Sequence, residues 1–321
     1  MRNTFVNCLI EQARIDDRII IISPDMGFTV FEKFIDEFPD RFYNVGVAEQ
    51  NAIGVASGLA LSGKMVYVYS IIPFITMRCF EQIRINIAYM NCNVRLVGVG
   101  AGLTYGAQGP THHAIEDISI MRSLPNMTVC CPGDPIETRE LINESFHYKG
   151  PIYFRLGKNG ERNIHRENTK IKIGKAVTIS EGDFLAIITT SNMLEQGKLI
   201  TEKFFEYGKN ITLISMPTIK PLDIEIITDL INQDIPIITL EEHSIIGGLG
   251  TAVAEVISES NKKIKFKRIG LPDEYSRYIG NQFYLREKYN LNDISSQLIQ
   301  KIMEDSYDQN KILSCFTNVK R

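Results

Sequence analysis

Short apolar runs rich in β-branched residues alternate with helical patterns along this chain, and that alternation constrains the fold most. The first series predicts buried strands at residues 18–25, 65–70, 94–100, 127–132 and 151–155. Helical patterns separate them at residues 48–62, 74–90, 112–123 and 134–147. Continuous apolar strands that alternate with helices are typical of a parallel sheet covered on both faces.

A second series of the same kind follows a polar stretch. It predicts strands at residues 184–190, 211–216, 235–242 and 263–270, with helices that begin near Gly247 and Asn292. The polar stretch, residues 157–182, is predicted to hold one edge strand. A chain of 321 residues is long for one core. We therefore predict an α/β protein with two domains, residues 1–165 and 183–321, joined by a linker over residues 166–182. Each domain is expected to be a mostly parallel sheet covered by helices.

Composition and charge exclude several classes of function. The formal net charge of −3 gives no strong field for holding nucleic acid. No apolar run approaches the roughly 20 residues that a membrane-spanning helix needs. The six cysteines form no C-x-x-C pair, which favours buried thiols in a reducing cytoplasm over disulfides. We therefore expect a cytoplasmic protein that binds neither nucleic acid nor membrane.

Glu49 lies in the first turn of a predicted helix whose other residues are mostly apolar or small. Gly54 and Gly58 stand four residues apart on that helix, so another element can approach it closely. A carboxyl group in a dry setting has a raised pKa, which suits proton exchange near neutral pH. An acid at a helix N-terminus is also explained by the helix dipole alone. The residues leave both interpretations open.

Phe74, Arg78 and Gln82 recur every four residues, which places them on one face of a predicted helix. An aromatic ring at a strand-to-helix turn can stack on a planar ligand. The alternative is that Phe74 belongs to the core and Arg78 pairs with a nearby acid. Taken alone, this spacing favours the alternative.

The segment "GAQGPTHHAIED", residues 106–117, contains two of the five histidines. A glycine-rich turn precedes Thr111, a plausible N-cap for the predicted helix. Adjacent helical residues point about 100° apart, so His112 and His113 are not expected to share a metal. One of the two histidines can face the strand ends while the other faces away. No metal site is predicted in this chain.

Arg155 ends the apolar run "PIYFR". An arginine at the end of a buried parallel strand can meet an anion at the carboxyl edge of the sheet, where ligands bind in such folds. A salt bridge to a neighbouring acid is an equal alternative. The sequence contains no P-loop, G-x-S-x-G elbow or cluster of zinc ligands.

Four motifs together resemble the thiamine-diphosphate enzymes of the transketolase family: "VGVAEQNAIGVASGLALSGK", "YSIIPFITMRCFEQIR", "GAQGPTHHAIEDISIMRSLPNMTV" and "CPGDPIET". They follow in the family's order, and the resemblance covers nearly the whole chain. It implies a pyrimidine-binding domain at residues 1–165 and a transketolase C-terminal domain after the linker.

The resemblance implies thiamine diphosphate as the cofactor and assigns roles to four residues. Glu49 matches the glutamate that hydrogen-bonds the aminopyrimidine ring and so promotes removal of a proton from the thiazolium carbon. Phe74 matches the ring that stacks on the aminopyrimidine, and Arg78 and Gln82 lie on the same wall.

Three further residues stand at positions of the family's substrate channel, and two of them match the family. His112 matches a histidine that binds donor hydroxyls or the developing oxyanion, and Arg155 matches an arginine that holds the substrate phosphate. With His112 in this role, His113 is expected to face away, into packing or the subunit boundary. Gln108 stands where typical members carry an aspartate, in the pattern D-G-x-T-H. Glutamine removes a charge and adds a hydrogen-bond donor, so the family's ordinary ketose-phosphate donor is in doubt. A specialised sugar pathway is therefore suggested.

The G-D-G motif, with which the family binds diphosphate and metal in a separate domain, does not occur in this sequence. The resemblance therefore implies a split enzyme. Two copies of this chain would associate with two copies of an N-terminal subunit that holds the diphosphate and Mg²⁺ or Ca²⁺. The chain alone is expected to be inactive.

These observations predict the pyrimidine-binding subunit of a transketolase-like enzyme that transfers a two-carbon ketol unit between sugars or sugar phosphates. One alternative is the β-subunit of a 2-oxo acid decarboxylating or dehydrogenase enzyme, or an enzyme like deoxyxylulose-phosphate synthase. Another is a non-catalytic α/β binding subunit. The sequence names neither the ketol donor nor the acceptor.

Overall fold

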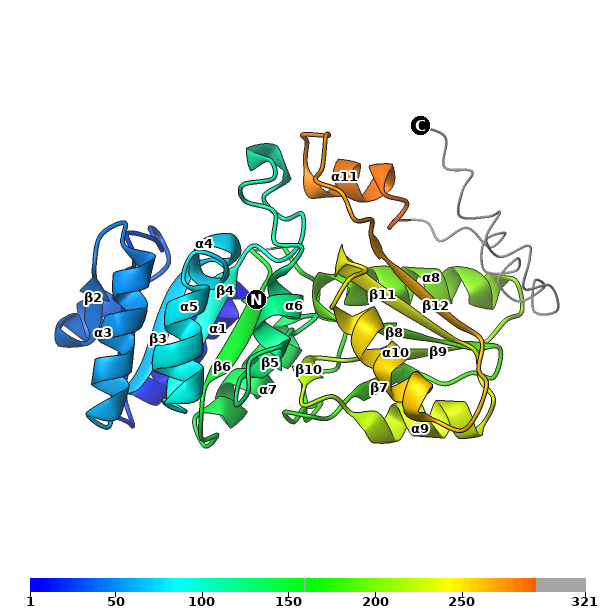
Figure 1. Cartoon of the computed structure of the whole chain (residues 1–321), viewed down its shortest axis with the longest axis horizontal. Helices are drawn as coiled ribbons and strands as arrows, with labels where there is room; N and C mark the ends of the chain where they lie inside the picture. Colours follow the sequence, from blue (N-terminus) through cyan, green and yellow to red (C-terminus); the bar gives the residue numbers. More distant parts are fainter. Residues whose placement is uncertain (159, 293–321) are drawn as a thin grey trace.

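A computed structural model describes residues 1–158 and 160–292 of the chain. Two sheets lie side by side, each flanked by helices (Figure 1). This confirms the predicted α/β class with two mostly parallel sheets. One apolar cluster spans both sheets, from Val66 and Leu96 in the first to Ile188 and Ile214 in the second. The two domains therefore share a continuous core.

The first sheet has the strand order β10-β5-β6-β4-β3-β1-β2. Six of its strands come from the first half of the chain: β1 (Ile19–Ser23), β2 (Phe42–Asn44), β3 (Met65–Ile71), β4 (Val94–Val99), β5 (Thr128–Cys130) and β6 (Ile152–Leu156). These six pair in parallel. Its helical segments are α1 (Arg2–Ala13), α2 (Glu32–Glu37), η1 (Pro39–Arg41), α3 (Glu49–Leu61), α4 (Ile72–Thr76), α5 (Phe80–Gln82), η2 (Ile83–Tyr89), η3 (Gly106–Gln108), α6 (Asp117–Arg122) and α7 (Pro135–Ser145).

The second sheet has the order β12-β11-β8-β9-β7. Its strands are β7 (Val177–Ser180), β8 (Leu185–Thr189), β9 (Ile211–Ser215), β11 (Ile237–Ser244) and β12 (Phe266–Leu271). β7 is the predicted edge strand of the polar stretch and pairs antiparallel with β9. The accompanying helices are η4 (Ser191–Met193), α8 (Leu194–Glu206), α9 (Ile224–Asn232), α10 (Leu249–Glu259) and α11 (Gln282–Lys288).

Strand β10 (Thr218–Lys220) was not predicted, and it crosses from the second half of the chain to the edge of the first sheet. It pairs antiparallel with β5, with Thr218 opposite Cys130. The backbone N–H of Cys131 also donates to the carbonyl of Pro217 at 2.7 Å. A three-residue strand at an edge has too few residues to show an alternating pattern in the sequence.

Two predicted helices are shorter or more broken than expected. The pattern over residues 74–90 forms α4, α5 and the π-helical η2 rather than one α-helix. The Thr76 hydroxyl donates to the carbonyl of Ile72 at 2.7 Å, a back-bond that bends helices. The helix predicted at 112–123 begins only at Asp117, because Ala114 pairs as an isolated β-bridge with Gly102. The helix predicted from Asn292 lies outside the described residues apart from Asn292 itself.

Candidate active site

Glu49 begins α3, and only 4% of its surface is exposed. Arg78 follows α4, and its Nη1 lies 2.7 Å from Oε2 of Glu49. The guanidinium carbon of Arg78 also lies 5.0 Å from the centre of the Phe74 ring. This ion pair is the alternative that the sequence left open for Arg78, pairing with a nearby acid. The ion pair and the ring contact together join Arg78 to Glu49 and Phe74, which the resemblance assigns to one site.

His112 comes from a later segment of the chain than Phe74, yet the two rings are neighbours. Their centres are 5.1 Å apart and their planes meet at 71°. The ring of Tyr105 packs edge-on against His112 at 6.2 Å. The Thr111 hydroxyl lies 2.9 Å from Nδ1 of His112, which fixes the orientation of the imidazole. The structure therefore groups Glu49, Arg78, Phe74 and His112.

Gln82 stands in α5, at the end of the predicted face. Its Nε2 donates to the carboxylate of Glu81 at 2.8 Å, whereas its Oε1 is buried without a hydrogen-bond partner in the described part of the chain. A buried amide oxygen without a donor is unfavourable and is suited to accept a hydrogen bond from a ligand.

Gln108 and His113 take different positions in the turn around η3. Gln108 is exposed at the tip. His113 is 3% exposed, and its Nε2 lies 3.4 Å from the carbonyl of Gly106. Burial lowers the pKa of His113, so the neutral imidazole is favoured. Its packed position agrees with the prediction, although the segment is a turn and not a helix.

Arg155 lies in β6 and is fully buried. Its Nε donates to Asp117 at 2.9 Å and its Nη1 to the Ser191 hydroxyl at 2.9 Å. Its Nη2 donates to the carbonyls of Ala114 and Glu242 at 2.9 and 3.0 Å. The guanidinium thus ties β6 to elements of both domains, and binding a substrate phosphate would require breaking these bonds. Of the two alternatives that the sequence left open for Arg155, the structure contains the salt bridge, and its acid is Asp117.

Lys158 was not singled out in the sequence, yet it lies three residues beyond Arg155, just past the carboxyl end of β6. Its Nζ lies 5.0 Å from the centre of the Tyr105 ring, which itself contacts His112. Lys158 is half-buried, so it can still reach a ligand. The signal that could have found it is the second cation in the run "RLGK".

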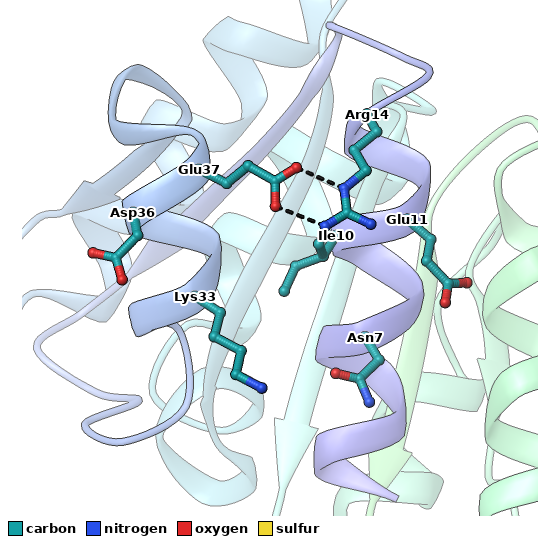
Figure 2. Close-up of a pocket in the computed structure, with 7 residues that line it drawn as sticks. All are labelled: Asn7, Ile10, Glu11, Arg14, Lys33, Asp36 and Glu37. Carbon is teal, nitrogen blue, oxygen red and sulfur yellow. Dashed lines mark hydrogen bonds and ion pairs between the residues drawn. The ribbon is translucent and has the colours of Figure 1, made fainter.

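Two surface hollows lie apart from this cluster. One, of about 540 Å³, lies between α1 and α2, and Figure 2 shows the Arg14–Glu37 ion pair that crosses it, with N···O distances of 2.6 and 2.9 Å. The other, of about 760 Å³, is lined mainly by residues of β7, β9 and α9 and the turns beside them. Neither is lined by a residue predicted for the active site.

Within residues 1–158 and 160–292, no group of three or more His, Cys, Asp and Glu side chains could hold a metal ion. The helices in that part of the chain are too short or too polar to cross a membrane. Five cysteines in it, Cys8, Cys79, Cys92, Cys130 and Cys131, are buried free thiols.

Comparison with known families gives two matches in chain order. Residues 1–162 match the transketolase pyrimidine-binding domain, and residues 174–289 match the transketolase C-terminal domain.

Similar curated proteins include a putative transketolase C-terminal section of Methanocaldococcus jannaschii, 39% identical over 95% of this chain and 96% of the relative. A 6-deoxy-6-sulfo-D-fructose transketolase subunit of Clostridium sp. strain MSTE9 is 36% identical over 91% of this chain and 90% of its own length. One of the subunits of an apulose-4-phosphate transketolase from Actinobacillus succinogenes is 34% identical, over 86% of this chain and 88% of its own length.

Among solved structures, a split-gene transketolase in an inactive β4 tetramer superposes with a TM-score of 0.82. It is 32% identical, and the match covers 90% of this chain and 93% of that one. A transketolase of Campylobacter jejuni has a TM-score of 0.76 at 16% identity, and this chain spans 46% of its length. At this low identity, the second similarity is evidence for a shared fold alone.

Proposed function

Because this chain belongs to the transketolase family, we propose that it is the pyrimidine-binding subunit of a split, thiamine-diphosphate-dependent transketolase. It would transfer a two-carbon ketol unit between sugars or sugar phosphates. The observation that carries this proposal is the grouping of Glu49, Phe74 and His112, three residues from separate segments, at one place in the first domain.

The residues present fit the aminopyrimidine half of the cofactor. Thiamine diphosphate supplies the nucleophilic carbon and the electron sink for ketol transfer when it is bound. The buried carboxylate of Glu49 would share a proton with a ring nitrogen, and the half-buried Phe74 would pack on the ring. The unpartnered Oε1 of Gln82 would accept from the amino group. Arg78 would hold the Glu49 carboxylate in place.

His112, Gln108 and Lys158 are the residues that we propose for the substrate. His112 would donate to a hydroxyl or to oxygen that gains negative charge. The exposed amide of Gln108 would read a donor hydroxyl without adding charge. Relatives act on a sulfonated and on a phosphorylated sugar, so the substrate is expected to carry an anion far from the reacting carbonyl. Lys158 would bind that anion.

The diphosphate and its Mg²⁺ or Ca²⁺ would be held by a separate N-terminal subunit in an α2β2 assembly. A related split-gene chain forms a β4 tetramer that is inactive, which supports both self-association and the need for a partner. The buried free thiols support assembly in a reducing cytoplasm.

We place the assembly surface on α3 and η2, beside Glu49. Exposed apolar side chains here include Leu61 at the end of α3, which is 63% exposed, and Tyr89 at the end of η2, which is 77% exposed. Val47, two residues before α3, is also 77% exposed. Apart from the adjacent residues and the backbone of α3 itself, a Cβ atom added to Gly54 or Gly58 would meet no atom of the described chain within 4 Å. A helix with open space at two glycines and exposed apolar neighbours is suited to close packing against another subunit.

The experiment that tests this function is reconstitution with the diphosphate-binding subunit, comparing the wild type with Glu49→Gln. Glutamine keeps the shape but cannot exchange the proton, so turnover should fall by about 10²- to 10⁴-fold, the range for a lost acid–base residue. Circular dichroism checks that the variant is folded. Wild-type turnover in Glu49→Gln would contradict the mechanism, and carbon dioxide release from pyruvate would favour the decarboxylating alternative. Failure of the wild-type assembly to bind thiamine diphosphate would favour a non-catalytic subunit.

A further inference from the structure

The substrate loop, residues 101–116, follows β4 and has a buried neck below an exposed tip. At the neck, Gly102 and Ala114 form an antiparallel bridge with N···O distances of 3.1 and 2.9 Å. Leu103 and Ile115 pack into an apolar cluster whose other members all come from the second half of the chain. The neck of the loop is therefore part of the core of the second domain.

Glu242 of β11 joins this neck to α11. Its carboxylate is buried and accepts the backbone N–H of Leu103 at 2.5 Å. The same oxygen accepts Nε2 of Gln282 at 2.8 Å and Nδ2 of Asn192 at 3.3 Å. The other oxygen pairs with Nε of Arg286. One side chain thus holds the loop, η4 and α11 together.

The loop fits closely against these partners. Gly102 has a φ of +61°, and a Cβ there would collide with the carboxylate of Glu242. A Cβ on Gly106, nearer the tip, would lie 2.5 Å from the carbonyl oxygen of Gly280. Figure 1 shows α11 and the segment around η3 projecting beside each other from the same edge of the molecule.

We infer that Glu242 is a positioning residue that fixes the substrate loop against α11 and so sets where Gln108 and His112 meet the substrate. A carboxylate suits this place because it accepts from a buried backbone amide and from a cation at once. The positive charge of Arg286 compensates its burial. The claim that Glu242 positions Gln108 and His112 for the substrate rests on the proposed function. The claim that Glu242 fixes the loop against α11 does not.

The experiment compares Glu242→Gln with Glu255→Gln in the full chain. Glu255 is the matched control because it also pairs with an arginine, Arg122, but is exposed. In Glu242→Gln, amide hydrogen exchange in residues 101–116 should quicken by about tenfold, and exchange in β3 should stay unchanged. With the partner subunit present, KM for the ketose donor should rise by about tenfold, with affinity for thiamine diphosphate unchanged.

Each result decides a separate claim. Unchanged exchange in the loop would overturn the role of Glu242, and quicker exchange with an unchanged donor KM would overturn the positioning of the substrate residues. If the wild-type assembly shows no ketol transfer, the proposed function fails, and the exchange result still decides whether Glu242 holds the loop. If Glu242→Gln does not fold, Gln282→Ala removes two of the bonds from α11 and is expected to quicken exchange in the same loop.

Discussion

Two cations near the end of β6 have opposite surroundings, although the sequence separates them by only three residues. Arg155 is enclosed by Asp117 and by backbone carbonyls, with its guanidinium bonds made inside the protein. Lys158 lies beside Tyr105, next to His112, and is half-buried. A binding site for a substrate anion needs a cation that a ligand can reach, so we propose Lys158 for the role that the family resemblance assigned to Arg155.

Replacing Lys158 should therefore weaken substrate binding and leave the chemical step almost unchanged. In Lys158→Gln, KM for a phosphorylated or sulfonated substrate is expected to rise by about tenfold or more, since hydrogen bonds to charged groups contribute about 1.5–3 kcal/mol. Steady-state kinetics of the assembled enzyme measures this. Lys209→Gln is the control, because Lys209 also packs over an aromatic ring, that of Phe184, in the second domain. An unchanged KM in Lys158→Gln would place the anion elsewhere.

Among the helices and strands, the sequence predicted the long apolar strands and the helices with strong end signals. The helix predicted at residues 134–147 forms as α7, and Asp134 caps it by accepting the N–H of Glu137 at 2.7 Å. The short β10 was missed because its pairing with β5, far away in the sequence, decides it. The break after α4 was missed because the four-residue spacing does not reveal the local back-bond from Thr76 to the carbonyl of Ile72. In the site, the sequence showed the four-residue spacing of Phe74, Arg78 and Gln82. It did not show which acid pairs with Arg78, because Glu49 lies 29 residues away in the chain.

The junction of β6 with α6 provides a test of stability. Arg155→Met would leave the buried carboxylate of Asp117 without its cation, which costs about 3–5 kcal/mol of unfolding free energy. Urea unfolding followed by circular dichroism measures the loss. Arg122→Met is the matched control, because its pair with Glu255 is partly exposed and should contribute less than about 1 kcal/mol. Equal stability of the two variants would show that Arg155 does not hold this junction.

In the molecule as a whole, the two domains share a core, and the apolar face on α3 and η2 remains exposed. Gly58→Arg tests whether that face is an assembly surface. The substitution should raise the stability of the isolated chain by up to about 1 kcal/mol, because arginine favours a helix more than glycine does. It should nevertheless block assembly, since a long side chain would fill the space left by the glycine.

Thermal unfolding of the chain and sedimentation velocity with the partner subunit measure these two effects. Ser258→Arg, on an exposed position of α10 in the second domain, is the control and should assemble normally. Normal assembly of Gly58→Arg would move the interface away from α3.

Transfer of an intact two-carbon ketol unit is the activity that this chain is proposed to complete. A ketose donor labelled with ¹³C at its first two carbons reports on that transfer when it is followed by NMR in the presence of both subunits, thiamine diphosphate and Mg²⁺. We predict that both labelled carbons appear together in a new ketose, and that neither subunit alone produces it. Label that stays in the donor, while the same assembly releases carbon dioxide from pyruvate, would show that the enzyme is a decarboxylase and not a transketolase.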